Sequence, residues 1–188
     1  MSKLVVSEFI TLDGVVEDPG GAESFEHGGW SFKFEQGPEG EQYKLDEVLA
    51  ADALLLGRVT YEGFAAAWPS RDGEFADKFN GMPKYVVSST LKDPEWTNTT
   101  VLEGDPVEAV HRLKEEQDGT IAVHGSGMLA QALIDNDLVD ELALMVYPVV
   151  VGKGRRFFGE TTEMKMLELA ETRTYDGSVL VLIYRRAA

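Results

Sequence analysis

The sequence contains no cysteine among its 188 residues. This absence excludes disulfide bonds, thiolate nucleophiles, Cys-ligated zinc sites and iron–sulfur clusters. Histidine is also scarce, because only His27, His111 and His124 occur, and they do not have the spacing of metal ligands. We therefore expect no bound metal in this protein.

Basic residues are few compared with acidic ones. The chain has 17 Lys and Arg against 33 Asp and Glu, which gives a formal net charge of −16. Such a charge repels nucleic-acid phosphates and anionic lipid head groups, so we expect neither a nucleic acid nor a membrane as partner. A small anionic ligand is still compatible, because backbone N–H groups and one or two arginines act through a local field.

The sequence also lacks a long apolar run. No stretch approaches the ~18 apolar residues that a membrane helix needs. Glu8 comes too early for the apolar region of a signal peptide. With 44% hydrophobic residues, however, a chain of this length can bury a substantial core. We expect one domain over residues 1–188, located in the cytoplasm.

Short apolar runs alternate with helix-like spacing through most of the chain. This alternation is typical of βαβ units around a mainly parallel sheet. Strands are predicted at residues 4–10, 53–56, 85–88, 100–102 and 120–124. Helices are predicted to begin near Glu41, Thr60 and Pro106, and after the Gly125-Ser126-Gly127 turn. Leu45, Val48 and Leu49 give the first helix its inward face. A polar stretch around Trp68 follows the second helix.

The end of the chain has a different pattern. Residues 141–151, 167–175 and 179–184 are predicted to be strands with no helix between them, and Asp176-Gly177 is a hairpin signal. The last two strands should therefore be antiparallel. The predicted fold is α/β, with a mostly parallel central sheet, antiparallel C-terminal strands and helices on both faces.

A long connection, residues 11–40, is rich in glycine and acidic residues. Connections of this length in a compact domain are usually functional or disordered. His27 and Trp30 lie within it. They either cover a substrate pocket as a lid or anchor the loop through an aromatic contact.

Two junctions place glycine between a predicted strand and a predicted helix. At the first, Gly57 lets a ligand approach the backbone, Arg58 adds a charge suited to phosphate, and Thr60 adds a hydroxyl. At the second, Gly125, Ser126 and Gly127 could hold a diphosphate, although the pattern is neither G-x-G-x-x-G nor a Walker loop. Ordinary strand–helix turns with Thr or Ser caps would explain either junction alone.

The two junctions together indicate a ligand site more strongly than either one alone, because ligands of open α/β sheets bind at the carboxyl ends of the strands. We predict that they meet in one anion-binding cleft. A third strand end, Ser88-Ser89-Thr90, offers hydroxyls to a ribose phosphate, with Lys92 nearby. Such hydroxyls more often satisfy backbone groups of a turn.

Five segments in this order resemble the dihydrofolate-reductase-like superfamily, especially the reductase domain that forms the C-terminal half of bacterial bifunctional riboflavin-biosynthesis deaminase-reductases. The resemblance covers nearly the whole chain. Its segments are residues 7–14 (SEFITLDG), 56–61 (LGRVTY), 87–89 (VSS), 124–129 (HGSGML) and 146–158 (VYPVVVGKGRRFF).

The resemblance implies that NADPH is the hydride donor and that a small molecule is the substrate. It places Gly57, Arg58 and Thr60 at the phosphates, Ser88 and Ser89 by the 2′-phosphate, and Gly125, Ser126, Gly127 and Met128 along the diphosphate and the nicotinamide. It places Asp13 and Gly14 beside the substrate, where Trp30 and His124 are further candidates. It also implies a homodimer.

The sequence departs from the pattern at two points. A folate reductase carries an acid on its first long helix, and Glu41 is the nearest equivalent by its distance from Gly57, but the residues around it do not match. The bifunctional enzymes also carry a zinc deaminase domain with a Cys-x-x-Cys motif, which a chain without cysteine lacks. The sequence is therefore interpreted as a reductase domain alone.

The leading hypothesis is an NADPH-dependent reductase of a pterin-like or ribosylamino-pyrimidine compound, similar to 5-amino-6-(5-phosphoribosylamino)uracil reductase of riboflavin biosynthesis. Asp13, Glu41 or a bound water would supply the proton. The first alternative is a non-catalytic nucleotide-binding or regulatory domain that keeps the reductase fold. The second is a dimeric scaffold without a ligand.

Overall fold

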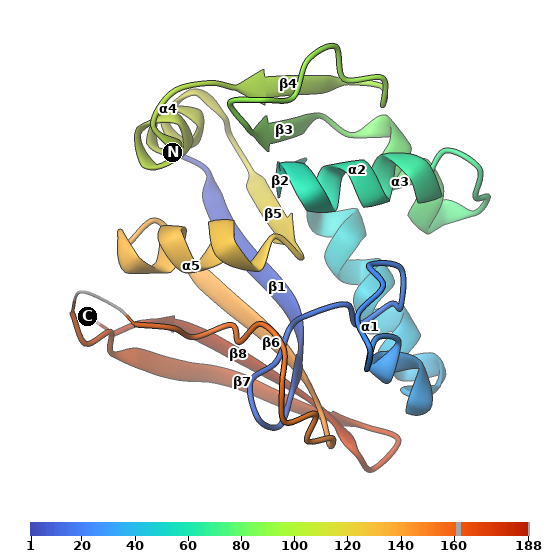
Figure 1. Ribbon diagram of the computed structural model, residues 1–188. Helices are drawn as coiled ribbons and strands as arrows, with labels where there is room; N and C mark the ends of the chain where they lie inside the picture. The colour runs from blue at the N-terminus through green and yellow to red at the C-terminus, as the bar shows by residue number, and fades with distance from the viewer. Residues whose placement is uncertain (161–162, 188) are drawn as a thin grey trace.

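The computed structural model describes residues 1–160 and 163–187. Its eight-stranded sheet has the order β4-β3-β2-β5-β1-β6-β8-β7 (Figure 1). The strands are β1 (Lys3–Thr11), β2 (Ala53–Gly57), β3 (Lys84–Val87), β4 (Thr99–Leu102), β5 (Thr120–His124), β6 (Glu141–Tyr147), β7 (Leu167–Tyr175) and β8 (Val179–Arg186). The first six strands pair in parallel, and β8 runs antiparallel to both β6 and β7. The predicted α/β fold class is confirmed.

Helices cover both faces of the sheet, as predicted. They are α1 (Gly37–Ala50), α2 (Arg58–Ala67), α3 (Glu74–Gly81), α4 (Pro106–Glu116) and α5 (Gly127–Asp135), with a short 3-10 helix η1 at Trp30–Lys33. Helices α4 and α5 pack in one apolar cluster, whereas α1, α2 and α3 pack in another on the opposite face. Within the described ranges, every helix is too short or too polar to cross a bilayer.

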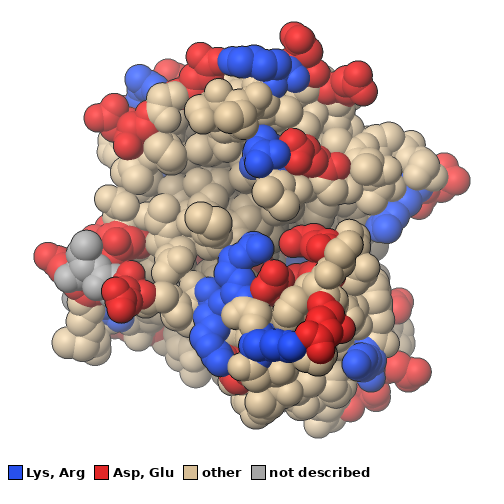
Figure 2. Space-filling model, viewed as in Figure 1, with Lys and Arg blue, Asp and Glu red and all other residues tan. Residues whose placement is uncertain are grey.

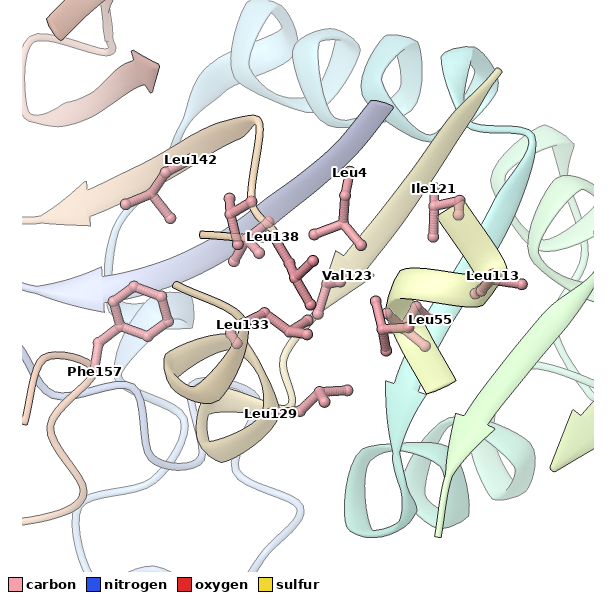
Figure 3. Close-up of a cluster of buried hydrophobic side chains, with 14 of the residues drawn as sticks. Leu4, Leu55, Leu113, Ile121, Val123, Leu129, Leu133, Leu138, Leu142 and Phe157 are labelled. Atoms are coloured by element: carbon pink, nitrogen blue, oxygen red, sulfur yellow. The ribbon is translucent and has the colours of Figure 1, made fainter. Parts of the chain in front are cut away.

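The larger apolar cluster fixes helix α5 on the sheet. Leu129 and Leu133 of α5 lie toward Leu55 of β2 and Val123 of β5 (Figure 3). Leu55, Val123 and Leu133 are fully buried. Burial contributes about 1.5–3 kcal/mol for each such side chain. The start of α5, which is the second glycine junction, is therefore held at the end of β5.

An aromatic cluster anchors the loop that follows β1. The rings of Trp30 and Phe9 each lie with their centroids 5.4 Å from the ring centroid of Tyr147. The indole N–H of Trp30 also donates to the carbonyl oxygen of Glu17 at 2.9 Å. Trp30 is 1% exposed, so it packs as a core residue. Of the two roles open to Trp30, the structure shows the anchoring contact.

Two local features differ from the sequence-based expectation. Helix α3 occupies part of the connection that was assigned no helix, and its Phe75 stacks on Trp68 with ring centroids 4.9 Å apart. Strand β6 ends at Tyr147 rather than at residue 151. Pro148 follows directly, and it has no N–H to donate to a neighbouring strand.

Two signals read from short motifs are confirmed. Asp176 and Gly177 both have positive φ, 47° and 70°, and with Ser178 they form the hairpin turn that joins β7 to β8, between the paired residues Tyr175 and Val179. The carboxylate of Asp105 accepts hydrogen bonds from the N–H groups of Val107 and Glu108, so it caps α4.

Candidate functional site

The predicted ligand-binding segments follow neighbouring parallel strands. Strands β3, β2, β5 and β1 lie side by side in that order, so their carboxyl ends share one edge of the sheet. Ser88 follows β3, Gly57 ends β2, Gly125 follows β5, and Asp13 lies just beyond β1. This edge is where open α/β sheets bind their ligands.

The two glycine junctions are joined by two reciprocal hydrogen bonds. The N–H of Gly57 donates to Ser126 Oγ at 2.9 Å, and the N–H of Ser126 donates to Thr60 Oγ1 at 2.9 Å. The predicted meeting of these segments is therefore found in the structure. Both hydroxyls act as acceptors here, so each keeps its own hydrogen for a ligand oxygen.

The start of each helix leaves backbone donors at this edge. Helix α2 begins at Arg58 and α5 begins at Gly127, and neither has a side-chain cap among the described residues. The first N–H groups of a helix have no partner within it, and they carry the positive end of the helix dipole. Two such ends meet here, which favours an anion.

Gly125 has a conformation that suits glycine alone at this position. Its φ is 58°, and a Cβ atom there would lie 3.0 Å from Thr60 Cγ2. A larger residue would have to displace Thr60, which accepts the hydrogen bond from Ser126. Glycine thus permits the close approach of the two junctions.

Arg58 and Met128 lie on the surface beside the joined turns. The guanidinium of Arg58 contacts both carboxylate oxygens of Glu62 at 3.0 Å, one helical turn away. An exposed pair of this kind contributes little to stability, so a phosphate can compete for the arginine. Met128 is 75% exposed. In the space-filling view, the middle of this face is hollowed and mostly uncharged (Figure 2).

The hydroxyl groups after β3 have different surroundings. Ser88 Oγ accepts hydrogen bonds from the N–H groups of Thr90 and Leu91, at 3.1 and 2.9 Å, so it organises the turn. Ser89 is exposed beside it. Lys92 pairs with Glu103 at 3.5 Å.

Asp13 ties the loop after β1 to the turn after β6. Its carboxylate accepts hydrogen bonds from Thr11 Oγ1 at 2.7 Å, from Gly152 N at 2.8 Å and from Val151 N at 3.2 Å. Burial opposes ionisation of this carboxyl, but the hydrogen bonds outweigh it and hold the pKa at about 2. Asp13 is therefore ionised at neutral pH. Gly14 follows with φ 84° and donates its N–H to the carbonyl oxygen of Thr11.

The basic residues of the turn at 153–156 are paired with acids of the loop after β1. Lys153 binds Glu26, Arg155 lies 3.8 Å from Glu17, and Arg156 lies 3.7 Å from the carboxylate of Asp13. These pairs cross from the turn after β6 to the loop after β1. The cluster holds two connections together at the carboxyl edge of the sheet.

Glu41 is exposed on α1, whereas Tyr43, Lys44 and Glu47 of the same helix are partly buried. His124 is 7% exposed at the end of β5, and its ring centroid lies 5.6 Å from that of Phe79.

The sequence reading missed a buried polar cluster under the second glycine junction. Lys44 Nζ donates to Ser7 Oγ at 2.9 Å and to a carboxylate oxygen of Glu47. Ser7 is paired with His124 in the register of β1 and β5. Lys44, Glu47 and the buried Val48 have the spacing of residues on one helix face. This spacing was the sequence signal that the two charged residues face the sheet.

Burial and neighbouring charges set the ionisation of this cluster. Burial, helped by the nearby charge of Lys44, lowers the pKa of His124 to about 4, so its imidazole is neutral. Burial opposes ionisation of Glu47, but the charge of Lys44 and its hydrogen bond outweigh burial and lower the pKa of that carboxyl. The cluster at neutral pH is thus an ammonium, a carboxylate and a neutral imidazole.

Glu8 is a second buried acid on β1. It is 5% exposed, and its Oε1 has no hydrogen-bond partner in the described part of the chain. Burial raises its pKa to about 8, against the opposing effect of Lys44. Glu8 therefore holds a proton at neutral pH.

Surface recesses occur away from the strand ends as well. One of about 430 Å³ lies between α1 and β7, and another of about 260 Å³ lies where α5 ends and β6 begins. Neither is lined by the glycine junctions. The meeting of two helix starts, in contrast, has a defined chemistry, because it offers backbone donors to an anion.

A comparison with protein families identifies the family of this chain. The model of the RibD C-terminal domain family matches residues 2–181 of this chain. The chain belongs to this family. The resemblance stated from the motifs is confirmed, and RibD C-terminal domains are of the riboflavin-biosynthesis reductase type.

Two Bacillus subtilis (strain 168) proteins are similar to this RibD C-terminal domain over nearly their full length. YwjB is 27% identical over 185 residues, which cover 98% of both chains. YyaP is 24% identical over 188 residues, which cover 97% of this chain and 94% of that protein. Both relatives are uncharacterized proteins.

Solved structures establish the dihydrofolate-reductase-like fold. A protein from Shewanella sp. PV-4, assigned provisionally to riboflavin biosynthesis, has a TM-score of 0.80 at 19% identity and covers 99% of both chains. RibD from Acinetobacter baumannii has a TM-score of 0.66 at 14% identity, covering all of this chain and 59% of that one. Dihydrofolate reductase from Enterococcus faecalis, complexed with NADP(H), has a TM-score of 0.59 at 15% identity, covering 99% of this chain and 97% of that one.

Proposed function

We propose that the protein is an NADPH-dependent reductase of a small pterin-like or ribosylamino-pyrimidine compound. The observation that carries the proposal is the joining of the two glycine junctions through Thr60 and Ser126. This joining brings two helix starts to one point on the carboxyl edge of a parallel sheet, which suits a diphosphate. Membership of the RibD C-terminal domain family supports the reductase chemistry.

The residues present fit a phosphorylated dinucleotide. Arg58 and the first N–H groups of α2 would bind phosphate oxygens, together with Gly57 and Thr60. Gly125, Ser126, Gly127 and Met128 would lie along the diphosphate and the nicotinamide. Ser88 and Ser89, one strand further along the edge, would face the 2′-phosphate. The E. faecalis reductase of similar fold was solved with NADP(H), which supports this choice of cofactor.

The nicotinamide supplies the hydride when it is bound. The protein orients the substrate and provides the electrostatic environment for the transfer. Asp13 and Gly14 would lie beside the substrate, with His124 at the end of β5. Asp13 is ionised at neutral pH and Glu41 is exposed. Among the proton sources that the sequence suggested, these observations favour a bound water.

Fluorescence titration with NADPH tests the cofactor site. The wild-type chain should bind NADPH saturably, and Arg58→Ala should weaken binding by about tenfold, because a charge-assisted contact to phosphate is lost. Arg112→Ala, an exposed arginine on α4, is the matched control and should bind as the wild type does. The absence of saturable binding, or an equal effect of both substitutions, would contradict the proposal.

Turnover distinguishes a reductase from a non-catalytic nucleotide-binding domain. Oxidation of NADPH is followed by its absorbance with 5-amino-6-(5-phosphoribosylamino)uracil and with 7,8-dihydro-6-methylpterin as acceptors. Consumption of NADPH with either acceptor supports the reductase. Tight NADPH binding without turnover of either compound would favour the non-catalytic alternative.

A further inference from the structure

Lys92 and Glu103 form an exposed ion pair at the carboxyl ends of β3 and β4, which lie side by side (Figure 1). Lys92 Nζ lies 3.5 Å from Glu103 Oε1, and the two side chains are 71% and 72% exposed. Leu102 of β4 is paired with Val87 of β3, and the carbonyl oxygen of Leu102 accepts the N–H of Ser88 at 3.4 Å. Ser88 and Glu103 are the next residues of the two segments, so they are neighbours across the strand ends.

The ion pair therefore lies where the proposed function places the 2′-phosphate of the nucleotide, beside Ser88 and Ser89. Ser88 Oγ accepts two N–H groups of its own turn, so its hydroxyl can offer a ligand only its hydrogen. Hydrogen bonds from uncharged donors to a phosphate are weaker than those from a cation. The charged side chains next to the serines thus determine how strongly a 2′-phosphate is bound.

The charges at this strand end do not favour a 2′-phosphate. Such a group carries a charge of about −1.5 to −2 at neutral pH. The positive charge of Lys92 is paired with the carboxylate of Glu103. Asp105, which caps α4, and Glu108 in the first turn of that helix bring further negative charge to the end of β4. Like charges repel, so the field here opposes the group that distinguishes NADPH from NADH.

The diphosphate site has different electrostatics. Its donors are the joined starts of α2 and α5, whose backbone N–H groups carry no compensating acid. NADPH and NADH have the same diphosphate, so both can use these donors equally. Binding of a nucleotide and discrimination between the two nucleotides therefore depend on separate parts of the chain.

A carboxylate beside the adenosine ribose suits a nucleotide without the 2′-phosphate. In dinucleotide sites an acid accepts a hydrogen bond from the ribose 2′-hydroxyl of NAD, whereas a cation accommodates the 2′-phosphate of NADP. Glu103 offers such a carboxylate, and its exposure makes it accessible to a ribose hydroxyl.

We propose that Glu103 determines the nucleotide preference of this chain and makes NADH nearly as good a ligand as NADPH. Glu103 neutralises Lys92, repels the 2′-phosphate of NADPH and accepts a hydrogen bond from the 2′-hydroxyl of NADH. Lys92 can bind the 2′-phosphate only when this carboxylate is removed. The inference rests on the proposed function for the position of the nucleotide, and it refines the choice of hydride donor.

Fluorescence titrations of one protein with NADPH and with NADH test the preference. For the wild type, we expect two dissociation constants that agree within about threefold, because the shared diphosphate contributes most of the binding. Glu103→Gln removes the repulsion and frees Lys92, so it should tighten NADPH binding by about tenfold. It should also weaken NADH binding several-fold, because the amide is a poorer acceptor for the 2′-hydroxyl.

A double-mutant cycle tests whether the gain comes from Lys92. Lys92→Met alone should weaken NADPH binding several-fold and leave NADH binding unchanged, because Glu103 then faces the 2′-phosphate unopposed. Combined with Glu103→Gln, it should abolish most of the roughly tenfold gain in NADPH affinity. Both side chains are exposed, so the variants should unfold at the wild-type temperature, which thermal unfolding checks.

Glu171→Gln is the matched control. It removes the same charge from another exposed ion pair, with Arg173, on β7 at the opposite edge of the sheet. It should change neither affinity, since charges farther apart than about 10 Å are screened at 0.1 M salt. An equal effect of Glu171→Gln and Glu103→Gln would overturn the inference.

Two further results would overturn the inference while the proposed cofactor site stands. One is wild-type binding of NADPH that is tighter than that of NADH by about 100-fold or more, which requires a cationic 2′-phosphate site. The other is an unchanged ratio of the two affinities in Glu103→Gln. Binding of neither nucleotide to the wild type would instead remove the proposed function and the inference together.

Discussion

Thr60 and Ser126 are linked across two strand–helix junctions that lie 66 residues apart in the chain. The threonine hydroxyl accepts the N–H of Ser126 at 2.9 Å, while the serine hydroxyl accepts the N–H of Gly57 at the same distance. Each hydroxyl oxygen thus accepts a hydrogen bond from a backbone N–H group of the opposite turn. The two helix starts are held together before any ligand binds, which lowers the entropic cost of binding.

Thr60→Val should therefore weaken both the fold and the cofactor site. Valine has nearly the same shape but no acceptor, so the N–H of Ser126 loses its partner. We expect the free energy of unfolding to fall by about 1–2 kcal/mol and NADPH affinity to fall several-fold. Urea unfolding and NADPH fluorescence titration measure the two effects.

Thr99→Val is the matched control for this prediction. Its hydroxyl donates to the carbonyl oxygen of Trp96 at 2.6 Å, at the amino end of β4. It should lower stability without changing NADPH affinity. An equal loss of affinity in both variants would contradict a specific role of Thr60.

Asp13 should stabilise the protein in a manner that depends on pH. Its folded-state pKa of about 2 lies below its ordinary value of 3.8, so its contribution is complete above about pH 5 and is lost as the pH falls through 2. Asp13→Asn should be less stable than the wild type at neutral pH by about 1–2 kcal/mol. The difference, measured by urea unfolding, should shrink toward about pH 3. A difference that does not change with pH would contradict the ionised state assigned to Asp13.

Glu8 should have the opposite effect on the pH dependence of the free energy of unfolding. The folded state keeps its proton up to about pH 8, whereas an exposed glutamate loses it near 4.5. The folded state therefore binds more protons between these values, and the free energy of unfolding falls as the pH rises through them.

Glu8→Gln is neutral at every pH, so it should remove this dependence. It should gain stability relative to the wild type between about pH 5 and about pH 8, by about 1 kcal/mol or more. Urea unfolding of both proteins at the two pH values measures the change. Parallel pH dependence of wild type and variant would show that Glu8 is ionised in the folded state.

Much of the fold could be predicted because local patterns agreed with the tertiary structure. The Asp105 cap, the Asp176-Gly177 turn and the buried strand β5 all appear as expected. Helix α3 was not predicted because its segment is short, follows Gly73 and ends at Gly81. Its signal was the pair Phe75 and Phe79 at helical spacing, whose rings pack 4.9 Å apart.

The sequence predicted only those parts of the candidate site in which backbone geometry, marked by glycine, creates the binding groups. Glycines at strand ends mark Gly57 and Gly125, and parallel pairing brings their turns to one edge. Lys44 and Glu47 could not be found in this way, because a lysine and a glutamate on a helix usually face solvent. Their burial depends on Ser7 and His124, which come from strands far away in the sequence.

Amide chemical-shift mapping with NADPH tests the central claim most directly. In ¹H–¹⁵N spectra of the wild-type chain, the largest shifts on adding NADPH should fall on Gly57, Thr60, Gly125, Ser126 and Gly127. Smaller shifts should reach Ser88 and Ser89. Shifts confined to the recess between α1 and β7, or the absence of any localised shift, would contradict the account.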